Sequence, residues 1–223
     1  METRIRSCED LIRLIDTWGF VPFFRNAICG FSVEELTPPE LWFSDTTEGP
    51  WEWKGPAIRQ SGCAYGKFFC GKAVFISREW YPEFANWRRD GYDYDARFED
   101  GLASLGDKHV YDLLEAHGPL LSTELKQLGG FGKDGRKGFD TVLTRLQMQG
   151  YATTADFEYR RDKHGAPYGW GIARYAVPEL HFGTDFTARV YAHTPEESRQ
   201  RILTHLAALF PQATETQLQK LLG

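Results

Sequence analysis

Basic residues gather in one part of an otherwise acidic chain, and the chemistry they offer is ion pairing with phosphate. The 223-residue sequence has a formal net charge of −5, yet Lys126 to Arg174 holds nine basic and five acidic residues. That segment carries +4, so the rest of the chain carries −9. Contact between one face of an acidic protein and phosphate groups requires such a local basic surface; charges that pair among themselves are the alternative explanation.

A predicted helix over residues 138–149 supplies the first group of candidate contact residues. At about 100° per residue, one face of this helix is apolar: Phe139, Val142, Leu143 and Leu146. The opposite face carries Thr141, Thr144, Arg145 and Met148, and Arg136 and Lys137 precede the helix. Two interpretations stay open. The helix lies in a DNA major groove with phosphate at its N-terminus, or this face is solvated and contacts another protein.

A predicted hairpin supplies the second group. Residues 151–160 and 168–177 read as two strands, and the turn between them contains Asp-Lys-His-Gly at 162–165. Near the tip lie the candidate contact residues Arg160, Arg161, Lys163, His164 and Tyr168. Basic and aromatic side chains on a hairpin suit the DNA backbone or minor groove. The alternative is a polar tip, with Tyr168 and Trp170 packed on the sheet.

The elements that must position both groups follow a familiar order. A predicted helix over residues 107–117 ends at Gly118-Pro119, a second helix begins at Ser122, and a glycine-rich turn leads to the helix and hairpin just described. Three helices followed by a two-stranded wing predict a winged helix-turn-helix from Asp107 to Glu179, a nucleic-acid-binding layout. Because the same layout also serves as a protein-interaction scaffold, fold alone does not fix function.

The remaining segments predict an aromatic-rich module before this unit and helices after it. We expect helices over residues 8–18, capped by Ser7, and 79–89, and a hairpin within residues 65–77. Residues 49–56 contain too much Gly and Pro for a regular element. Capping patterns at Thr194 and Thr214 open two tail helices. The predicted fold is α+β, with an N-terminal α/β module (1–104), a winged helix (105–180) and a C-terminal helical tail (181–223). Without a flexible linker, we expect the first two parts to pack together.

Several functional classes lack support in the sequence. The four cysteines form no CxxC pair and no metal-ligand spacing, which predicts reduced thiols, a cytoplasmic location and no bound metal. No signal peptide and no membrane-spanning run is recognisable. The absence of a P-loop, a GxGxxG and a GxSxG predicts no nucleotide cofactor and no serine hydrolase chemistry.

Two stretches resemble a known family. The first is residues 150–179, which end in Gly-Trp-Gly-Ile-Ala-Arg-Tyr-Ala-Val-Pro-Glu and look like the wing of AlkZ/YcaQ-type proteins. The second combines Trp51-Glu52-Trp53-Lys54 with residues 75–82, similar to an aromatic-Glu-aromatic strand region of the same proteins. The likeness is strongest to the shorter bacterial group called AlkZ-related proteins and covers nearly the whole chain.

The resemblance implies DNA binding and a place in DNA repair. AlkZ-type proteins are winged-helix DNA glycosylases that excise damaged and cross-linked bases through a Gln-x-Gln motif and a DNA-inserting β-hairpin. This chain is shorter and contains one clear winged helix. The N-terminal half has no Gln-x-Gln, whereas Gln147 and Gln149 match it at the end of the predicted third helix. Residues two apart on a helix point about 200° from each other, so ordinary polar residues at a helix end are the alternative.

Base excision also requires a group that positions water and a pocket for the base. The carboxylates that lie among aromatics are Glu52, Asp156 and Glu158, and the aromatics that would stack a base are Trp51, Trp53, Tyr65 and Trp80. Lys54 and Lys67 would add positive charge for phosphate. Core packing explains the aromatics equally well. Three hypotheses follow: a protein that binds double-stranded DNA, an active DNA glycosylase, and a winged helix used for protein association.

Overall fold

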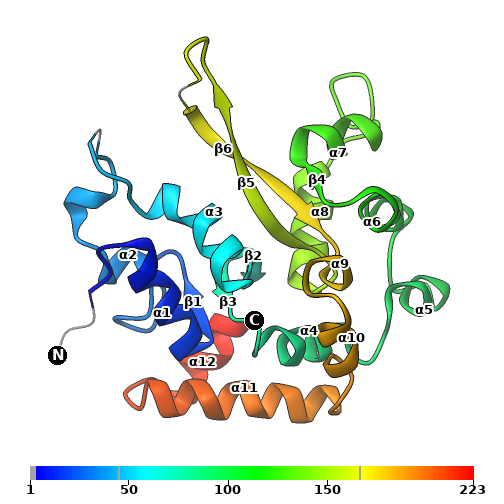
Figure 1. The fold of residues 1–223 in the computed structure, drawn as a ribbon. Helices are drawn as coiled ribbons and strands as arrows, with labels where there is room; N and C mark the ends of the chain where they lie inside the picture. Colours follow the sequence, from blue (N-terminus) through cyan, green and yellow to red (C-terminus); the bar gives the residue numbers. More distant parts are fainter. Residues whose placement is uncertain (1–3, 45, 166) are drawn as a thin grey trace.

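One antiparallel six-stranded sheet runs through the α+β fold (Figure 1). The computed structural model describes residues 4–44, 46–165 and 167–223, and of Pro167 and Tyr168 the backbone alone. In spatial order the strands are β1 (Phe20–Pro22), β3 (Lys72–Ile76), β2 (Ala64–Phe69), β5 (Thr153–Arg161), β6 (Pro167–Ala176) and β4 (Leu120–Leu121). The sheet therefore joins the predicted N-terminal module to the predicted winged helix, as expected without a linker. The division into three domains stays a prediction.

Helices from both the N-terminal and the C-terminal parts of the chain pack around this sheet (Figure 1). Before β4 they are α1 (Cys8–Trp18), α2 (Val33–Leu36), the 3-10 turn η1 (Pro39–Leu41), α3 (Pro50–Ser61), α4 (Tyr81–Arg89), α5 (Tyr94–Glu99) and α6 (Leu105–His117). After β4 they are α7 (Ser122–Leu128), α8 (Phe139–Met148), α9 (Pro178–Phe182), α10 (Thr184–Arg189), α11 (Pro195–Leu209) and α12 (Glu215–Leu222). The predicted caps are confirmed: the side-chain oxygens of Ser7, Thr194 and Thr214 accept from the backbone N–H groups of Asp10, Glu197 and Gln217.

The prediction that residues 49–56 form no regular element is wrong, because α3 begins at Pro50 and continues to Ser61. Pro50 occupies the first turn, where its missing N–H has no helical partner to lose. Glu52 Oε2 accepts from the N–H of Gly49 at 2.9 Å, which caps the start. Pro56 removes one internal hydrogen bond, and burial of Trp53, Ala57 and Ile58 against α1 and the sheet compensates.

The predicted hairpin within residues 65–77 is confirmed as β2 and β3. Its turn places Cys70 and Gly71 at positive φ, 48° and 71°. Tyr65 of β2 pairs with Thr154 of β5, and through this contact the hairpin lies beside the second half of the sheet.

The elements from α6 to β6 form a helix–hairpin unit, which we define as residues 105–176. The predicted helices over 107–117, from Ser122 and over 138–149 are confirmed as α6, α7 and α8. Between α6 and α7, β4 pairs with β6 through Leu120 and Tyr175. Strands β5 and β6 pair along their length and project beyond the rest of the molecule (Figure 1). Tyr94 of α5 stacks on Tyr111 of α6, with ring centroids 4.0 Å apart, and joins this unit's core.

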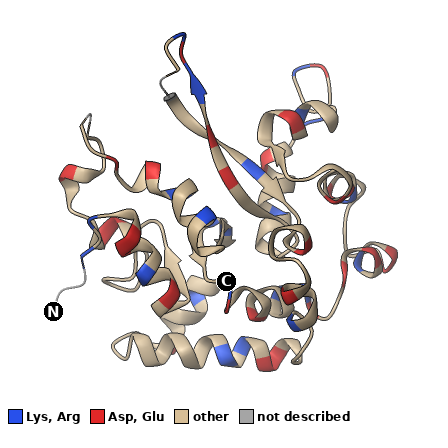
Figure 2. Ribbon diagram, viewed as in Figure 1, with Lys and Arg blue, Asp and Glu red and all other residues tan. Residues whose placement is uncertain are grey.

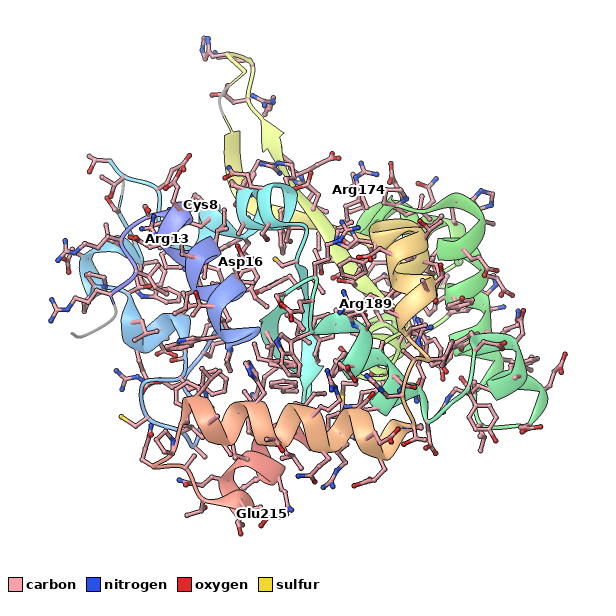
Figure 3. All side chains as sticks on the ribbon, turned by 60° about the horizontal axis from the view of Figure 1, so that its bottom comes forward. Cys8, Arg13, Asp16, Arg174, Arg189 and Glu215 are labelled. Atoms are coloured by element: carbon pink, nitrogen blue, oxygen red, sulfur yellow. The ribbon has the colours of Figure 1, made fainter. Side chains whose placement is uncertain are left out.

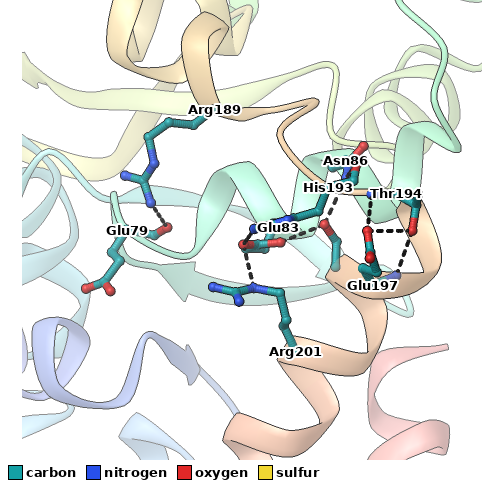
Figure 4. A network of polar contacts seen from close by, with 9 residues as sticks. Glu79, Glu83, Asn86, Arg189, His193, Thr194, Glu197 and Arg201 are labelled. Atoms are coloured by element: carbon teal, nitrogen blue, oxygen red, sulfur yellow. Dashed lines mark hydrogen bonds and ion pairs between the residues drawn. The ribbon is translucent and has the colours of Figure 1, made fainter.

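The tail helices pack on the N-terminal part of the chain. Leu206 and Phe210 share a core with Phe20 and Phe84. Glu83 of α4 reinforces this contact from the polar side (Figure 4): its Oε1 lies 2.8 Å from Arg201 Nε, and its Oε2 accepts from Ser198 Oγ at 2.6 Å. Asn86 donates to the same Ser198 at 2.8 Å. Helices α4 and α11 are therefore held by a partly buried polar network as well as by apolar packing.

Candidate nucleic-acid interface

Helix α8 divides into the two faces predicted for it. Phe139, Val142, Leu143 and Leu146 are buried in the core of the helix–hairpin unit. On the opposite face Thr141 is exposed and Thr144 is half-buried. A Cβ at Gly71 would lie 3.6 Å from Thr144 Cγ2 and 4.0 Å from Met148 Sδ, so the β2–β3 turn covers part of this face. The face predicted to enter a major groove is thus only partly open.

Arg145 is exposed but has a structural partner. Its Nη1 lies 3.5 Å from Oδ2 of Asp107, a residue of α6 that is only 2% exposed. The Asp107 carboxylate also accepts from the N–H of Ser104, although at 3.4 Å, as part of the α6 capping box. Arg145 therefore neutralises a buried charge of the fold, and any contact with phosphate would compete with that pair.

The turn before α8 holds its basic residues at the surface. Arg136 and Lys137 are exposed, and the backbone N–H of Arg136 donates to Gly130 O at 2.8 Å. Lys137 Nζ donates to Gly132 O at 2.8 Å, so this side chain closes the glycine-rich loop. Figure 2 shows residues of both charges in this loop. The structure brings both residues to the helix N-terminus, as predicted.

The tip of the β5–β6 hairpin carries exposed positive charge (Figure 2). Arg161 Nη1 donates to Gly165 O at 2.8 Å across the turn, and Asp162 Oδ1 accepts from the backbone N–H of His164. Lys163 and His164 are exposed. The side chain of Tyr168 lies outside the described residues. The tip thus combines cations at the end of a long projecting hairpin, and Asp162 is built into the turn.

Trp170 connects this hairpin to α3. Its side chain is 71% exposed, and its ring centroid lies 5.4 Å from that of Trp51 in a T-shaped arrangement. The sequence suggested packing of Trp170 on the sheet as one alternative, but gave no sign of Trp51 as partner because the two residues are far apart in the chain.

The three candidate carboxylates converge. Glu52, Asp156 and Glu158 all line a cavity of about 540 Å³ between α3 and β5. Each one already has a partner. Glu52 caps α3, Asp156 Oδ1 pairs with Arg59 Nη1, and Glu158 Oε1 accepts from Arg174 Nε at 2.9 Å. Arg174, labelled in Figure 3, also donates to Pro119 O at 2.8 Å. The cavity is acidic and polar. Its carboxylates also cap α3, join α3 to β5 and pair β5 with β6.

The two glutamines do not converge. Gln147 is 3% exposed, and its Oε1 accepts from the backbone N–H of Lys67 on β2 at 2.6 Å. Tyr175 lies on β6, and burial raises the pKa of its hydroxyl to about 12. Gln149 is the half-buried C-cap of α8. Gln147 therefore joins α8 to β2, whereas Gln149 ends α8, so the two side chains do not meet at one site.

The candidate stacking aromatics are scattered. Trp53 and Tyr65 are buried in the core, and Trp80 stacks on His205 with ring centroids 4.1 Å apart. Trp51 alone of these four lines a cavity near the hairpin, among the residues and cavities that the structure describes; its neighbours there are Phe24, Trp42 and Phe43. Sequence reasoning did not single out these three, because nothing in their spacing shows that they meet.

The sequence suggested that Lys54 faces phosphate. In the structure Lys54 lies on the inner face of α3 and is only 9% exposed. Its Nζ lies 4.3 Å from the ring centroid of Phe157, 4.9 Å from that of Trp51 and 5.9 Å from that of Phe23. Burial lowers the pKa of Lys54 to about 8, against a smaller opposing effect of Glu52. The Lys54 ammonium therefore contributes to the joint between α3 and β5.

Among residues 4–44, 46–165 and 167–223, no group of His, Cys, Asp or Glu side chains is arranged to hold a metal ion. Within the same ranges no helix is long and apolar enough to cross a membrane.

Comparison with known proteins adds one finding. A family model described as AlkZ related matches residues 5–223, nearly the whole chain. No curated protein and no solved structure matches it.

Proposed function

The chain belongs to the AlkZ-related family, and from this membership we propose that it binds double-stranded DNA in the cytoplasm and acts in DNA repair. The helix–hairpin unit serves as a winged helix-turn-helix in this proposal, with the β5–β6 hairpin as its wing.

One observation carries the proposal: the longest strands of the sheet form a hairpin that projects from the molecule with cations at its tip (Figures 1 and 2). Short strand β4, between α6 and α7, pairs with β6 at the base of that hairpin. This order of helices and strands supports a winged helix, in which the wing lies along the DNA backbone or enters a minor groove.

Phosphate contacts supply most of the affinity in this proposal. Thr144 lies against the β2–β3 turn and Arg145 pairs with Asp107, so α8 has few free groups for base edges. Lys163 and Arg161 at the tip, with Arg136 at the α8 N-terminus, contact the backbone. Such contacts fix position and carry little sequence information, which suits a protein that surveys DNA for damage.

Fluorescence anisotropy with a labelled 20-base-pair duplex tests the proposal. We expect binding at 50 mM salt that weakens steeply towards 200 mM, with a slope of about −0.9 per phosphate contact in a plot of log K against log salt. No binding at 50 mM salt would overturn the proposal and leave protein association as the function of the winged helix.

A second function, DNA glycosylase activity, has one observation in its favour: Glu52, Asp156 and Glu158 line one cavity between α3 and β5. A hydrolytic excision requires a carboxylate that orients water beside the sugar. Asp156 and Glu158 are paired with arginines, so Glu52, whose hydrogen bond is to the backbone of Gly49, is the best placed of the three.

Incubation with alkylated and cross-linked duplexes, followed by alkali, tests this second function, because strands break only where a base has been removed. We expect cleavage by the wild type and its loss in Glu52→Gln. Glu99→Gln, the same change at an exposed carboxylate of α5, is the matched control. Intact strands with the wild type, at protein concentrations that bind the duplex, would exclude excision and leave DNA binding in place.

A further inference from the structure

Two cavities in the N-terminal part of the chain share a wall. The first, about 440 Å³, is lined by the aromatic side chains of Phe24, Trp42, Phe43 and Trp51. The second, about 490 Å³, has three exposed arginines in its lining: Arg4, Arg6 and Arg25. Arg25, Thr37 and Pro39 line both. An aromatic space and a basic space therefore adjoin, with Arg25 between them.

The aromatic cavity is open to a ligand. Phe43 is 80% exposed and Phe24 40%, unusual values for large apolar side chains, and the volume lies in the range of small-molecule sites. Trp51 forms one side, with its ring centroid 6.0 Å from that of Phe24 and 5.7 Å from that of Trp42. Rings held at this spacing present flat faces and edges to a planar group.

The basic cavity favours an anion next to that planar group. Its three arginines outnumber its two carboxylates, Glu35 and Glu40, and Glu35 accepts hydrogen bonds from the hydroxyl of Ser32 and the N–H of Gly30. Arg25 Nε lies 4.0 Å from Glu34, and the same carboxylate accepts from the backbone N–H of Arg25 at 2.8 Å, so a phosphate here competes with Glu34 for an exposed guanidinium. A planar ring joined to a negative charge is the chemistry of a nucleotide.

The β5–β6 hairpin contacts one wall of the aromatic cavity. Trp170 of β6 contacts Trp51, so an aromatic path runs from the exposed face of the hairpin to the wall of the aromatic cavity. The segment that carries Trp42 and Phe43 and the hairpin project on the same side of the molecule (Figure 1).

We propose that the joined cavities bind one unpaired nucleotide of a DNA strand, with its base against Phe24, Phe43 and Trp51 and its phosphate beside Arg25 and Arg6. The inference rests on the proposed DNA binding for the source of the strand. It adds a second contact, specific for unpaired bases, at a distance from the basic tip. A strand opened at a lesion is the ligand that presents both features.

Anisotropy with a labelled 12-nucleotide thymidine single strand, beside the labelled duplex, tests the inference at 50 mM salt. We expect Phe43→Ala to weaken single-strand binding about five- to tenfold, since stacking of one base contributes at least about fivefold, and to leave duplex binding unchanged. Arg25→Gln should weaken the single strand several-fold and reduce its salt dependence.

The chain offers matched controls for both changes. Leu105 is 77% exposed and apolar, and the side chain of Arg13 is 73% exposed against 71% for that of Arg25. Leu105→Ala and Arg13→Gln should bind the single strand as the wild type does. Equal thermal midpoints across the four variants would show that binding changes do not reflect unfolding.

The possible results separate this inference from the proposed function. Single-strand affinity that is unaffected by Phe43→Ala and Arg25→Gln would overturn the inference, whatever the duplex does. Loss of duplex binding with Lys163→Ala alongside retained, Phe43-dependent single-strand binding would support the inference. Free thymidine 5′-monophosphate could displace the labelled single strand as strongly as an unlabelled single strand does. That result would make a free nucleotide the ligand and would overturn the assignment to DNA.

Discussion

Arg89 and Glu179 form an ion pair at the junction of the two halves of the molecule, with Arg89 Nη1 2.7 Å from Glu179 Oε1. Arg89, at the end of α4, is 2% exposed and also donates to Gly150 O from Nε and Nη2, at 3.2 and 2.9 Å. Burial disfavours its charge, but Glu179 and the hydroxyl of Tyr191 together outweigh that effect and raise the pKa of Arg89. Glu179 is the last residue of the stretch that carries the family resemblance, so the end of that stretch has a structural role in this fold.

Removal of the Glu179 carboxylate should destabilise the whole fold. Glu179→Ala leaves a buried guanidinium without its counter-charge, a loss of about 3 kcal/mol in the free energy of unfolding. We take the lower end of the usual range because the Glu179 side chain is 32% exposed. Urea denaturation followed by tryptophan fluorescence measures the change.

The pair of Arg199 and Glu196 provides the comparison. Its Nη1–Oε1 distance is 3.4 Å and the Glu196 side chain is 74% exposed, so Glu196→Ala should change stability by less than about 1 kcal/mol. Equal losses in the two variants would mean that Arg89 finds another partner or water, and that the pair does not hold the halves together.

Gln147→Leu distinguishes a structural glutamine from a catalytic one. The change leaves the N–H of Lys67 without its acceptor, which should cost about 1–2 kcal/mol of stability. Gln149→Leu, at the C-cap, should cost less than about 0.5 kcal/mol. If Gln147→Leu instead kept full stability and abolished base removal from alkylated DNA, the resemblance to the Gln-x-Gln motif would be functional after all.

Local patterns predicted the helices and hairpins well, because their causes are local. The apolar period of Phe139 to Leu146 identified the core face of α8, and side-chain caps identified the starts of α1 and α11. Helix α3 was missed because its Gly and Pro content disfavours a helix locally, while packing of Trp53 and Ile58 supplies the stability from elsewhere in the chain.

The site depends on contacts that no local pattern contains. Arg59 and Asp156 are 97 positions apart and meet because α3 packs beside β5. Gln147 and Lys67 are separated by 80 positions, and Arg145 meets Asp107 only once α6 and α8 are packed. The sequence pattern singled out carboxylates near aromatics, such as Glu52 and Glu158, which do line one cavity. It did not show that each carboxylate has a partner of its own.

Lys54 should make the stability of the protein depend on pH in alkaline solution. Its pKa in the folded protein is lowered by burial to about 8, from an ordinary value of 10.5. Below pH 8 both folded and unfolded chains carry the proton, and the full cost of burying the charge is present. Between about pH 8 and 10.5 the folded chain releases the proton first, so this residue's contribution to stability rises with pH.

The difference in unfolding free energy between the wild type and Lys54→Met isolates this effect. Between pH 7.5 and 10 we expect the unfolding free energy of the wild type to rise by about 1–2 kcal/mol relative to that of Lys54→Met. The rise is smaller than the cost of burying the charge alone would give, because the three aromatic rings favour the ammonium. Lys72→Met, a change of an exposed lysine, should show a constant difference over the same range. A constant difference for Lys54→Met as well would mean that Lys54 keeps an ordinary pKa.

Lys163→Ala and Arg145→Ala should show whether the β5–β6 hairpin or α8 supplies the proposed DNA affinity. Lys163 lies exposed at the hairpin tip, so its loss should weaken duplex binding several-fold and reduce the log–log salt slope by about 1, without affecting stability. Arg145→Ala should lower the unfolding free energy by about 1 kcal/mol, because Asp107 loses its counter-charge, and should change the salt slope less. Anisotropy from 50 to 200 mM salt and urea denaturation measure both quantities, with Lys220→Ala on remote α12 as the charge-matched control. A normal slope in Lys163→Ala together with a reduced slope in Arg145→Ala would move the interface from the hairpin to the outer face of α8.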